Sequence, residues 1–129
     1  MSDNPRDLRY TNDHEWARAD GANVRVGITK HAVEALGDIT LVNLDVKVGA
    51  ALTAGKPFGT VESVKAVSDL FAPISGKLVA VNGALNDKPE TVNEDPYGEG
   101  WMVVIEPAAG ESLDKLLTAD AYDALLGTL

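Results

Sequence analysis

Short runs of alternating apolar and polar residues recur along the chain. Val24, Val26 and Ile28 alternate with Arg25 and Gly27, which is the period-two pattern of a half-buried strand. Apolar or β-branched runs predict further strands, and turn residues such as Ala54-Gly55-Lys56-Pro57 separate them. The predicted strands span residues 24–28, 39–46, 58–64, 77–81 and 102–106. This spacing favours a mainly β sandwich or barrel over alternating strands and helices.

Helical spacing appears in three short segments. Thr29 can cap a helix over residues 30–36 that ends at Gly37. Near the C-terminus, Ser112 can cap residues 113–117 and Thr118 can cap residues 119–126, where apolar residues recur at i, i+3 and i+4. Helices this short depend on packing against the body of the protein.

Length and charge limit the function classes. The chain has 129 residues, which suits a single domain over residues 1–129. Its net charge of −9 argues against a nucleic-acid-binding protein and against docking on an anionic membrane. Residues 1–7 lack the apolar region of a secretory signal, so we expect a cytoplasmic protein. We also expect a monomer, with a flexible segment over residues 1–9.

Familiar catalytic and metal-binding patterns are missing from the sequence. It contains no cysteine and only two histidines, so disulfides, cysteine nucleophiles and closed zinc sites are not expected. No nucleophile paired with a base stands out. The residues alone therefore favour a binding or carrier protein with no catalytic residues and no metal over an enzyme.

One predicted hairpin carries a lysine at its tip. Apolar–polar runs at residues 59–63 and 67–71 flank Val64-Lys65-Ala66. The neighbours of Lys65 are small or apolar, so its ammonium is the long polar group that projects from the turn. A solvated turn lysine is the ordinary interpretation of such a residue.

The surrounding motifs resemble those of the lipoyl and biotinyl carrier domains. They are Val48-Gly49-x-x-Leu52-x-x-Gly55, Glu62-Ser63-Val64-Lys65-Ala66 and Ala72-Pro73-Ile74-Ser75-Gly76. These domains attach their cofactor to a lysine at an exposed hairpin tip. Biotinyl domains typically place methionines beside that lysine, whereas this chain has Val64 and Ala66, with Glu62 three residues earlier. The resemblance therefore implies covalent lipoate on Lys65.

Longer motifs resemble the H proteins of the glycine cleavage system. They include His14-Glu15-Trp16, Gly27-Ile28-Thr29-x-His31-Ala32 and residues 93–101, and the resemblance covers residues 10–126. It implies a flattened barrel or sandwich of two antiparallel sheets, with a short inserted helix and C-terminal helices. Lys30, Val33 and Asn43 depart from the residues usual in that family.

The resemblance also implies a function and a set of partners. The lipoyl arm is expected to take an aminomethyl group from a pyridoxal-phosphate-dependent glycine decarboxylase. It would deliver this group to a tetrahydrofolate-dependent aminomethyltransferase, and a dihydrolipoyl dehydrogenase would reoxidise the arm. A lipoate ligase or a lipoyl/octanoyl transferase would attach the cofactor.

Other functions remain open at this level. A lipoyl module could serve a 2-oxo acid dehydrogenase, although the flexible linker usual in such chains is missing. The chain could also donate lipoate to other proteins, or act as a binding module without a cofactor.

Three further residues carry specific expectations. In this family the loaded arm is understood to fold back against the protein, and Glu15 and Asp69 are the carboxylates we expect to hold its cationic end. Gly76 is expected in a tight turn with positive φ.

Overall fold

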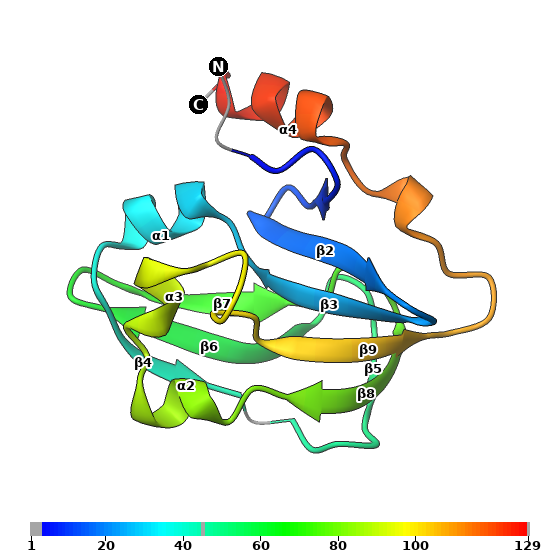
Figure 1. Cartoon of the computed structure of the whole chain (residues 1–129), viewed down its shortest axis with the longest axis horizontal. Coiled ribbons are helices and arrows are strands. Elements are labelled where there is room, and N and C mark those ends of the chain that lie inside the picture. Colours follow the sequence, from blue (N-terminus) through cyan, green and yellow to red (C-terminus); the bar gives the residue numbers. More distant parts are fainter. Residues whose placement is uncertain (1–3, 45, 129) are drawn as a thin grey trace.

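Two antiparallel sheets form the body of the protein (Figure 1). The computed structural model describes residues 4–44 and 46–128. The six-stranded sheet has the order β1-β2-β3-β9-β8-β5, and the three-stranded sheet has the order β4-β6-β7. The larger sheet comprises β1 (Arg9–Tyr10), β2 (Glu15–Asp20), β3 (Asn23–Ile28), β9 (Val103–Pro107), β8 (Gly76–Val81) and β5 (Ala51–Leu52). The smaller sheet comprises β4 (Ile39–Asn43), β6 (Pro57–Ser63) and β7 (Val67–Phe71).

The main hydrophobic core lies between these sheets. Val26 and Ile105 from the larger sheet and Val61 and Leu70 from the smaller one belong to the same buried cluster. Their alternation with outward-facing residues is the pattern that predicted the strands. The predicted mainly β architecture is confirmed as a flattened sandwich of two antiparallel sheets.

The strands that sequence analysis missed lack a simple alternation of buried and exposed residues. β2 begins with three consecutive buried residues, Glu15, Trp16 and Ala17. Trp16 is covered on the outer face, where its indole N–H donates to the Pro96 carbonyl at 2.9 Å, so both faces of this strand are buried. β1 and β5 are two residues each. The strand predicted over residues 39–46 ends at Asn43, and Asp45 lies outside the described residues.

Two of the predicted helices have the expected bounds. α1 spans Lys30–Leu36, the Thr29 hydroxyl accepts a hydrogen bond from the Ala32 amide at 3.2 Å, and Gly37 follows with φ 80°. α4 spans Ala119–Leu126 behind the Thr118 cap and covers β1 and the start of β2 (Figure 1).

The helix predicted over residues 113–117 is shorter than expected. It is a single 3₁₀ turn, η1 (Leu113–Lys115), capped by Ser112. The chain becomes extended afterwards because Leu117 pairs with Tyr10 through two backbone hydrogen bonds of 2.8 Å. Two further single-turn helices, α2 (Ala84–Asp87) and α3 (Thr91–Glu94), bury only Leu85 and Val92 and gave no helical pattern in the sequence.

Part of the segment expected to be flexible, residues 1–9, lies against α4. Asn4 donates to the Asp123 carboxylate of α4 at 2.7 Å, and Arg6 pairs with Asp120 at 2.9 Å. Leu8 is buried beneath the same helix. Asn4, Arg6 and Leu8 therefore contact α4, and residues 1–3 lie outside the described residues.

Within the described part of the chain, no helix combines the length and the apolar character needed to cross a bilayer.

Candidate functional site

A three-residue turn joins β6 to β7 and carries Lys65 at its centre. The Ser63 amide donates to the Ala66 carbonyl at 2.8 Å, which closes the hairpin. Val64, Lys65 and Ala66 are all exposed. The predicted hairpin with Lys65 at its tip is therefore confirmed.

Ser63 stabilises this turn with its side chain as well as its backbone. Its hydroxyl oxygen accepts hydrogen bonds from the Lys65 amide at 3.2 Å and the Ala66 amide at 3.1 Å. A serine that binds amides two and three residues later is a common turn-stabilising arrangement. The backbone of Lys65 is thus fixed while its side chain stays in solvent.

A second anchor connects the turn to the corner between α1 and β4. The Val64 amide donates to the Asp38 carbonyl at 3.1 Å. The Lys65 side chain lies beside Gly37, where an added Cβ would be 3.4 Å from Lys65 Cε. A Cβ at Gly37 would therefore only touch Lys65, and the cost of a side chain there comes from its positive φ.

Asn93 of α3 holds this corner from the other side. Its side-chain amide donates to the Gly37 carbonyl at 3.0 Å, and its oxygen accepts from the Ile39 amide at 2.8 Å. Sequence analysis included Asn93 in a family-like motif but assigned it no role. The local pattern could not show this role, because its partners lie 54 and 56 residues away.

Glu62 lies on β6 close to the tip. Cross-strand pairing places it between Leu41 of β4 and Val67 of β7. Paired residues of neighbouring strands face the same side of a sheet, so these three side chains form a row on the outer face of the three-stranded sheet.

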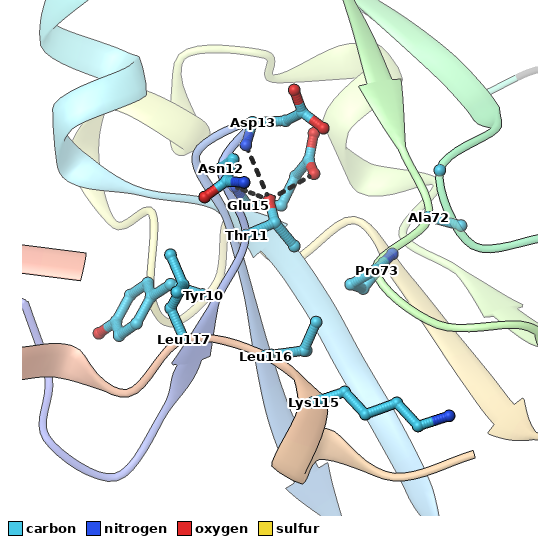
Figure 2. A pocket seen from close by; sticks show the side chains of 11 residues that line it. Tyr10, Thr11, Asn12, Asp13, Glu15, Ala72, Pro73, Lys115, Leu116 and Leu117 are labelled. Carbon is cyan, nitrogen blue, oxygen red and sulfur yellow. Dashed lines mark hydrogen bonds between the residues drawn. The ribbon is translucent and has the colours of Figure 1, made fainter. Parts of the chain in front are cut away.

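A groove of about 270 Å³ lies near the opposite end of β7 (Figure 2). It is bordered by the segment between β1 and β2, by the residues around Ala72 and by the chain just after η1. Its lining residues are Tyr10, Thr11, Asn12, Asp13, Glu15, Gly55, Ala72, Pro73, Lys115, Leu116 and Leu117.

Glu15 lines this groove but is almost fully buried, with 1% of its surface exposed. One carboxylate oxygen accepts from the Phe71 amide at 3.1 Å, and the other accepts from the Thr11 hydroxyl at 3.0 Å (Figure 2). Burial raises the pKa of Glu15 to about 8 against the opposing effect of these hydrogen bonds. The carboxyl group is therefore buried, and it connects β2 to the end of β7.

Asp69 is exposed on β7 and pairs with Thr60. It is not among the groove-lining residues, so the structure does not bring it together with Glu15. It lies between Lys65 and Phe71, whose amide binds Glu15. Lys65 and Phe71 are six residues apart, which corresponds to about 20 Å of extended strand.

The expected turn conformation of Gly76 is wrong. Gly76 begins β8 and is not among the residues with positive φ. The structural reason for glycine is close packing: an added Cβ would collide with the Glu106 carbonyl oxygen and lie 2.8 Å from Ile105 Cγ2. β8 and β9 approach too closely at this point for a side chain.

The chemistry that the hairpin offers is that of an accessible primary amine on a fixed support. Among the described residues, no three His, Asp or Glu side chains come together as possible metal ligands. A group joined to the Lys65 amine would extend from a rigid base into solvent.

Comparisons with known proteins identify the family. Residues 8–128 match the family model for the glycine cleavage H-protein. The glycine cleavage system H protein of Geobacillus kaustophilus is 57% identical over 122 residues, covering 95% of each chain. That of Myxococcus xanthus is 56% identical over 127 residues, covering 98% of each chain. The crystal structure of a glycine cleavage system H protein from Mycobacterium marinum superposes with a TM-score of 0.86 at 49% identity, covering 96% of this chain and 99% of that one. This chain therefore belongs to the glycine cleavage H-protein family.

Proposed function

We propose that this chain is the lipoyl-carrying shuttle of a glycine cleavage system and that Lys65 is its attachment residue. The observation that carries the assignment of Lys65 is its position at the centre of an exposed turn. Hydrogen bonds to Ser63 and Asp38 fix the backbone of that turn. Membership of the H-protein family supports the function itself.

The residues around Lys65 fit a covalently attached lipoyl group. The amine belongs to an exposed residue and forms no ion pair in the described part of the chain, so it can form an amide with the lipoate carboxyl group. When attached, the lipoyl group supplies a dithiolane that carries the cargo and undergoes two-electron redox chemistry. The absence of cysteine in the chain agrees with a redox pair that belongs to the cofactor.

The proposed partners follow from this role. They are the pyridoxal-phosphate-dependent glycine decarboxylase, the tetrahydrofolate-dependent aminomethyltransferase and the flavin-dependent dihydrolipoyl dehydrogenase. A lipoate ligase or a lipoyl/octanoyl transferase attaches the cofactor. The chain acts as a non-catalytic carrier among them, and we expect it to be a cytoplasmic monomer.

We also propose that the groove beside Glu15 receives the distal end of the arm. Asp69 is exposed on β7, along the way from Lys65 to this groove. With a pKa of about 8, Glu15 holds a proton at neutral pH while the groove is empty. A cationic cargo next to Glu15 would favour the ionised carboxyl and lower this pKa. Glu15 would then form a charge-assisted hydrogen bond to the cargo.

The H-protein relatives do not favour the two alternative carrier roles, in a 2-oxo acid dehydrogenase or in lipoate donation.

Modification of Lys65 is tested by incubating the purified chain with lipoate, ATP and a lipoate ligase. Intact mass and peptide mapping should place one lipoyl group on Lys65, and Lys65→Arg should remain folded but unmodified. Glycine–bicarbonate exchange with the decarboxylase should require the modified wild type. Modification at Lys56 or Lys77 instead would show that the assignment is wrong.

A further inference from the structure

One residue in the loop between β1 and β2 has a backbone conformation that its residue type disfavours. The Thr11 amide donates to the Glu15 carbonyl at 3.0 Å, and the His14 amide donates to the Thr11 carbonyl at 3.2 Å. These bonds define a three-residue hairpin loop in which a β-turn is followed by one residue in the left-handed region. That residue is His14, with φ 67°, and no other non-glycine residue in the described part of the chain has a positive φ.

The backbone of this loop does not explain why a histidine occupies the left-handed position. Glycine adopts a positive φ at little cost, whereas a residue with a Cβ atom is strained there. Such strain persists where several contacts fix the residue, and it indicates a role for the side chain. Because Glu15 follows directly and begins β2, the conformation of His14 sets the direction in which the chain presents the Glu15 carboxyl group.

The carbonyl group and the side chain of His14 are both bound. The Thr29 amide donates to the His14 carbonyl at 3.0 Å. His14 Nδ1 is hydrogen-bonded to the Tyr122 hydroxyl at 2.7 Å, and this hydroxyl is hydrogen-bonded to Thr29 Oγ1 at 2.8 Å. The three residues form a closed cycle of hydrogen bonds, which holds His14 against the cap of α1 and against α4.

The number of available protons assigns a direction to this cycle. Thr29 Oγ1 already accepts from the Ala32 amide at 3.2 Å. The Thr29 hydroxyl can donate to Tyr122, and the Tyr122 hydroxyl can then donate to His14 Nδ1, which requires a neutral imidazole protonated at Nε2. Burial, followed by the neighbouring His31 ring with its centroid 4.6 Å away, lowers the pKa of His14 and favours this neutral form.

We propose that His14 is a positioning residue for Glu15: the hydrogen-bond cycle keeps His14 in the left-handed conformation, and this conformation directs the Glu15 carboxyl group toward the Phe71 amide and the groove. The proposal rests on the proposed function of the groove. It adds a residue that acts through Glu15, since His14 is not among the residues that line the groove.

The effect of His14 on Glu15 can be measured in the protein without a cofactor. Burial is the dominant cause of the raised pKa of Glu15, and its hydrogen bond to the Phe71 amide opposes it. If His14 loses its fixed conformation, the Glu15 side chain gains contact with water and leaves the Phe71 amide. The pKa of Glu15 should then fall, because the effect of burial is the larger of the two, and the Phe71 amide should exchange faster.

The test compares His14→Ala with His31→Ala in the unmodified chain. The substitution is identical, and both variants lose the contact between the two imidazole rings, but His31 lies outside the cycle. In His14→Ala, NMR titration of the carboxyl carbon should show the pKa of Glu15 lowered from about 8 to about 7 or below. Exchange of the Phe71 amide should be faster by about fivefold or more. His31→Ala should leave both quantities as in the wild type.

Two further variants separate the imidazole from the backbone requirement. His14→Gly relieves the strain of the positive φ but removes the hydrogen bond to Tyr122. Tyr122→Phe leaves His14 in place and removes only the hydroxyl that binds it. Both variants should lower the pKa of Glu15 and speed exchange at Phe71, although the loop itself is not obstructed in either.

Wild-type values of both quantities in His14→Gly and Tyr122→Phe would overturn the positioning proposal, since the loop would then hold Glu15 without the cycle. Equal shifts in His14→Ala and His31→Ala would also overturn it, because the ring contact would then be the cause.

The lipoylated, aminomethyl-loaded protein gives the functional readout. Without the transferase, His14→Gly should lose the aminomethyl group faster than the wild type, as Glu15→Gln should. Equal loss from the wild type and Glu15→Gln would overturn the proposed function of the groove, whatever the pKa of Glu15 in the His14 variants. The failure of that function and the failure of the positioning proposal can therefore be distinguished.

Discussion

Glu15 shows how a single residue can link the sandwich to the candidate site. Its carboxyl group on β2 binds the Phe71 amide on β7, so it joins the two sheets directly. The same carboxyl group borders the groove. Its buried position makes the stability of the protein depend on its protonation.

The pH dependence of stability follows from the raised pKa of Glu15, which is about 8 in the folded protein. Between pH 4.5 and about 8, the native state holds a proton on Glu15 that the unfolded chain releases. The free energy of unfolding should therefore fall as pH rises through this window, by a few kcal/mol at most, since one pKa unit corresponds to about 1.4 kcal/mol. Urea titrations from pH 5 to 9 should show this decline in the wild type and a much smaller one in Glu15→Gln. An identical pH dependence in the two proteins would contradict the raised pKa. Glu106→Gln, at an exposed position on β9, is the matched control.

Gly76 is a residue whose importance sequence analysis predicted for the wrong reason. Because an added Cβ collides with the β9 backbone, Gly76→Ala should destabilise the protein by about 1–3 kcal/mol and Gly76→Val by more. Gly83→Ala is the control, since a Cβ there meets nothing within 4 Å. Thermal unfolding should separate the two alanine variants clearly. Equal stability would show that β8 and β9 can move apart at little cost.

At the residue scale, the position of Lys65 could be predicted from the sequence, whereas the environments of Glu15 and Gly76 could not. The position of Lys65 followed from a local pattern, because a hairpin tip is defined by the residues on either side of it. The burial of Glu15 depends on Phe71, 56 residues away, and the packing of Gly76 depends on Glu106. Neither contact leaves a local pattern in the sequence.

At the scale of elements, the short helix α3 supports the hairpin through Asn93. This side chain holds the Gly37 carbonyl and the Ile39 amide on both sides of Asp38, and the Asp38 carbonyl binds the Val64 amide. The support for the turn therefore reaches beyond β6 and β7.

Removing this support should loosen the turn. Asn93→Ala should destabilise the protein by about 1–3 kcal/mol and speed amide exchange at Ile39 and Val64, because two backbone groups lose their partner and the corner becomes mobile. Amide exchange followed by NMR checks this, with Asn86→Ala on the exposed side of α2 as the control. Unchanged exchange at Val64, together with faster exchange at Ile39, would mean that the corner does not support the turn.

For the whole molecule, alternation along the chain predicted the two-sheet sandwich, since burial between sheets imposes a period of two. The position of α4 relative to the body could not be predicted in this way. The hydroxyl of Tyr122 on α4 is hydrogen-bonded to His14 Nδ1 at 2.7 Å and to Thr29 Oγ1 at 2.8 Å, across separations of 108 and 93 residues. An amphipathic helix pattern identifies the buried face but not its partners.

The Tyr122 hydroxyl therefore joins the C-terminal helix, the start of β2 and the cap of α1. Burial raises its pKa to about 12, so it stays protonated over the ordinary pH range. Tyr122→Phe keeps the ring that stacks on Tyr10, with centroids 4.6 Å apart, and removes only the hydroxyl. His14 and Thr29 then lose a buried partner, so we expect the free energy of unfolding to fall by about 1–3 kcal/mol, with a clear fall in melting temperature.

Thr128→Ala, which removes an exposed hydroxyl bound to the Leu125 carbonyl at the end of α4, should change stability by less than about 0.5 kcal/mol. If Tyr122→Phe and Thr128→Ala both have the melting temperature of the wild type, α4 is held by ring packing alone and the hydroxyl does not connect these three elements.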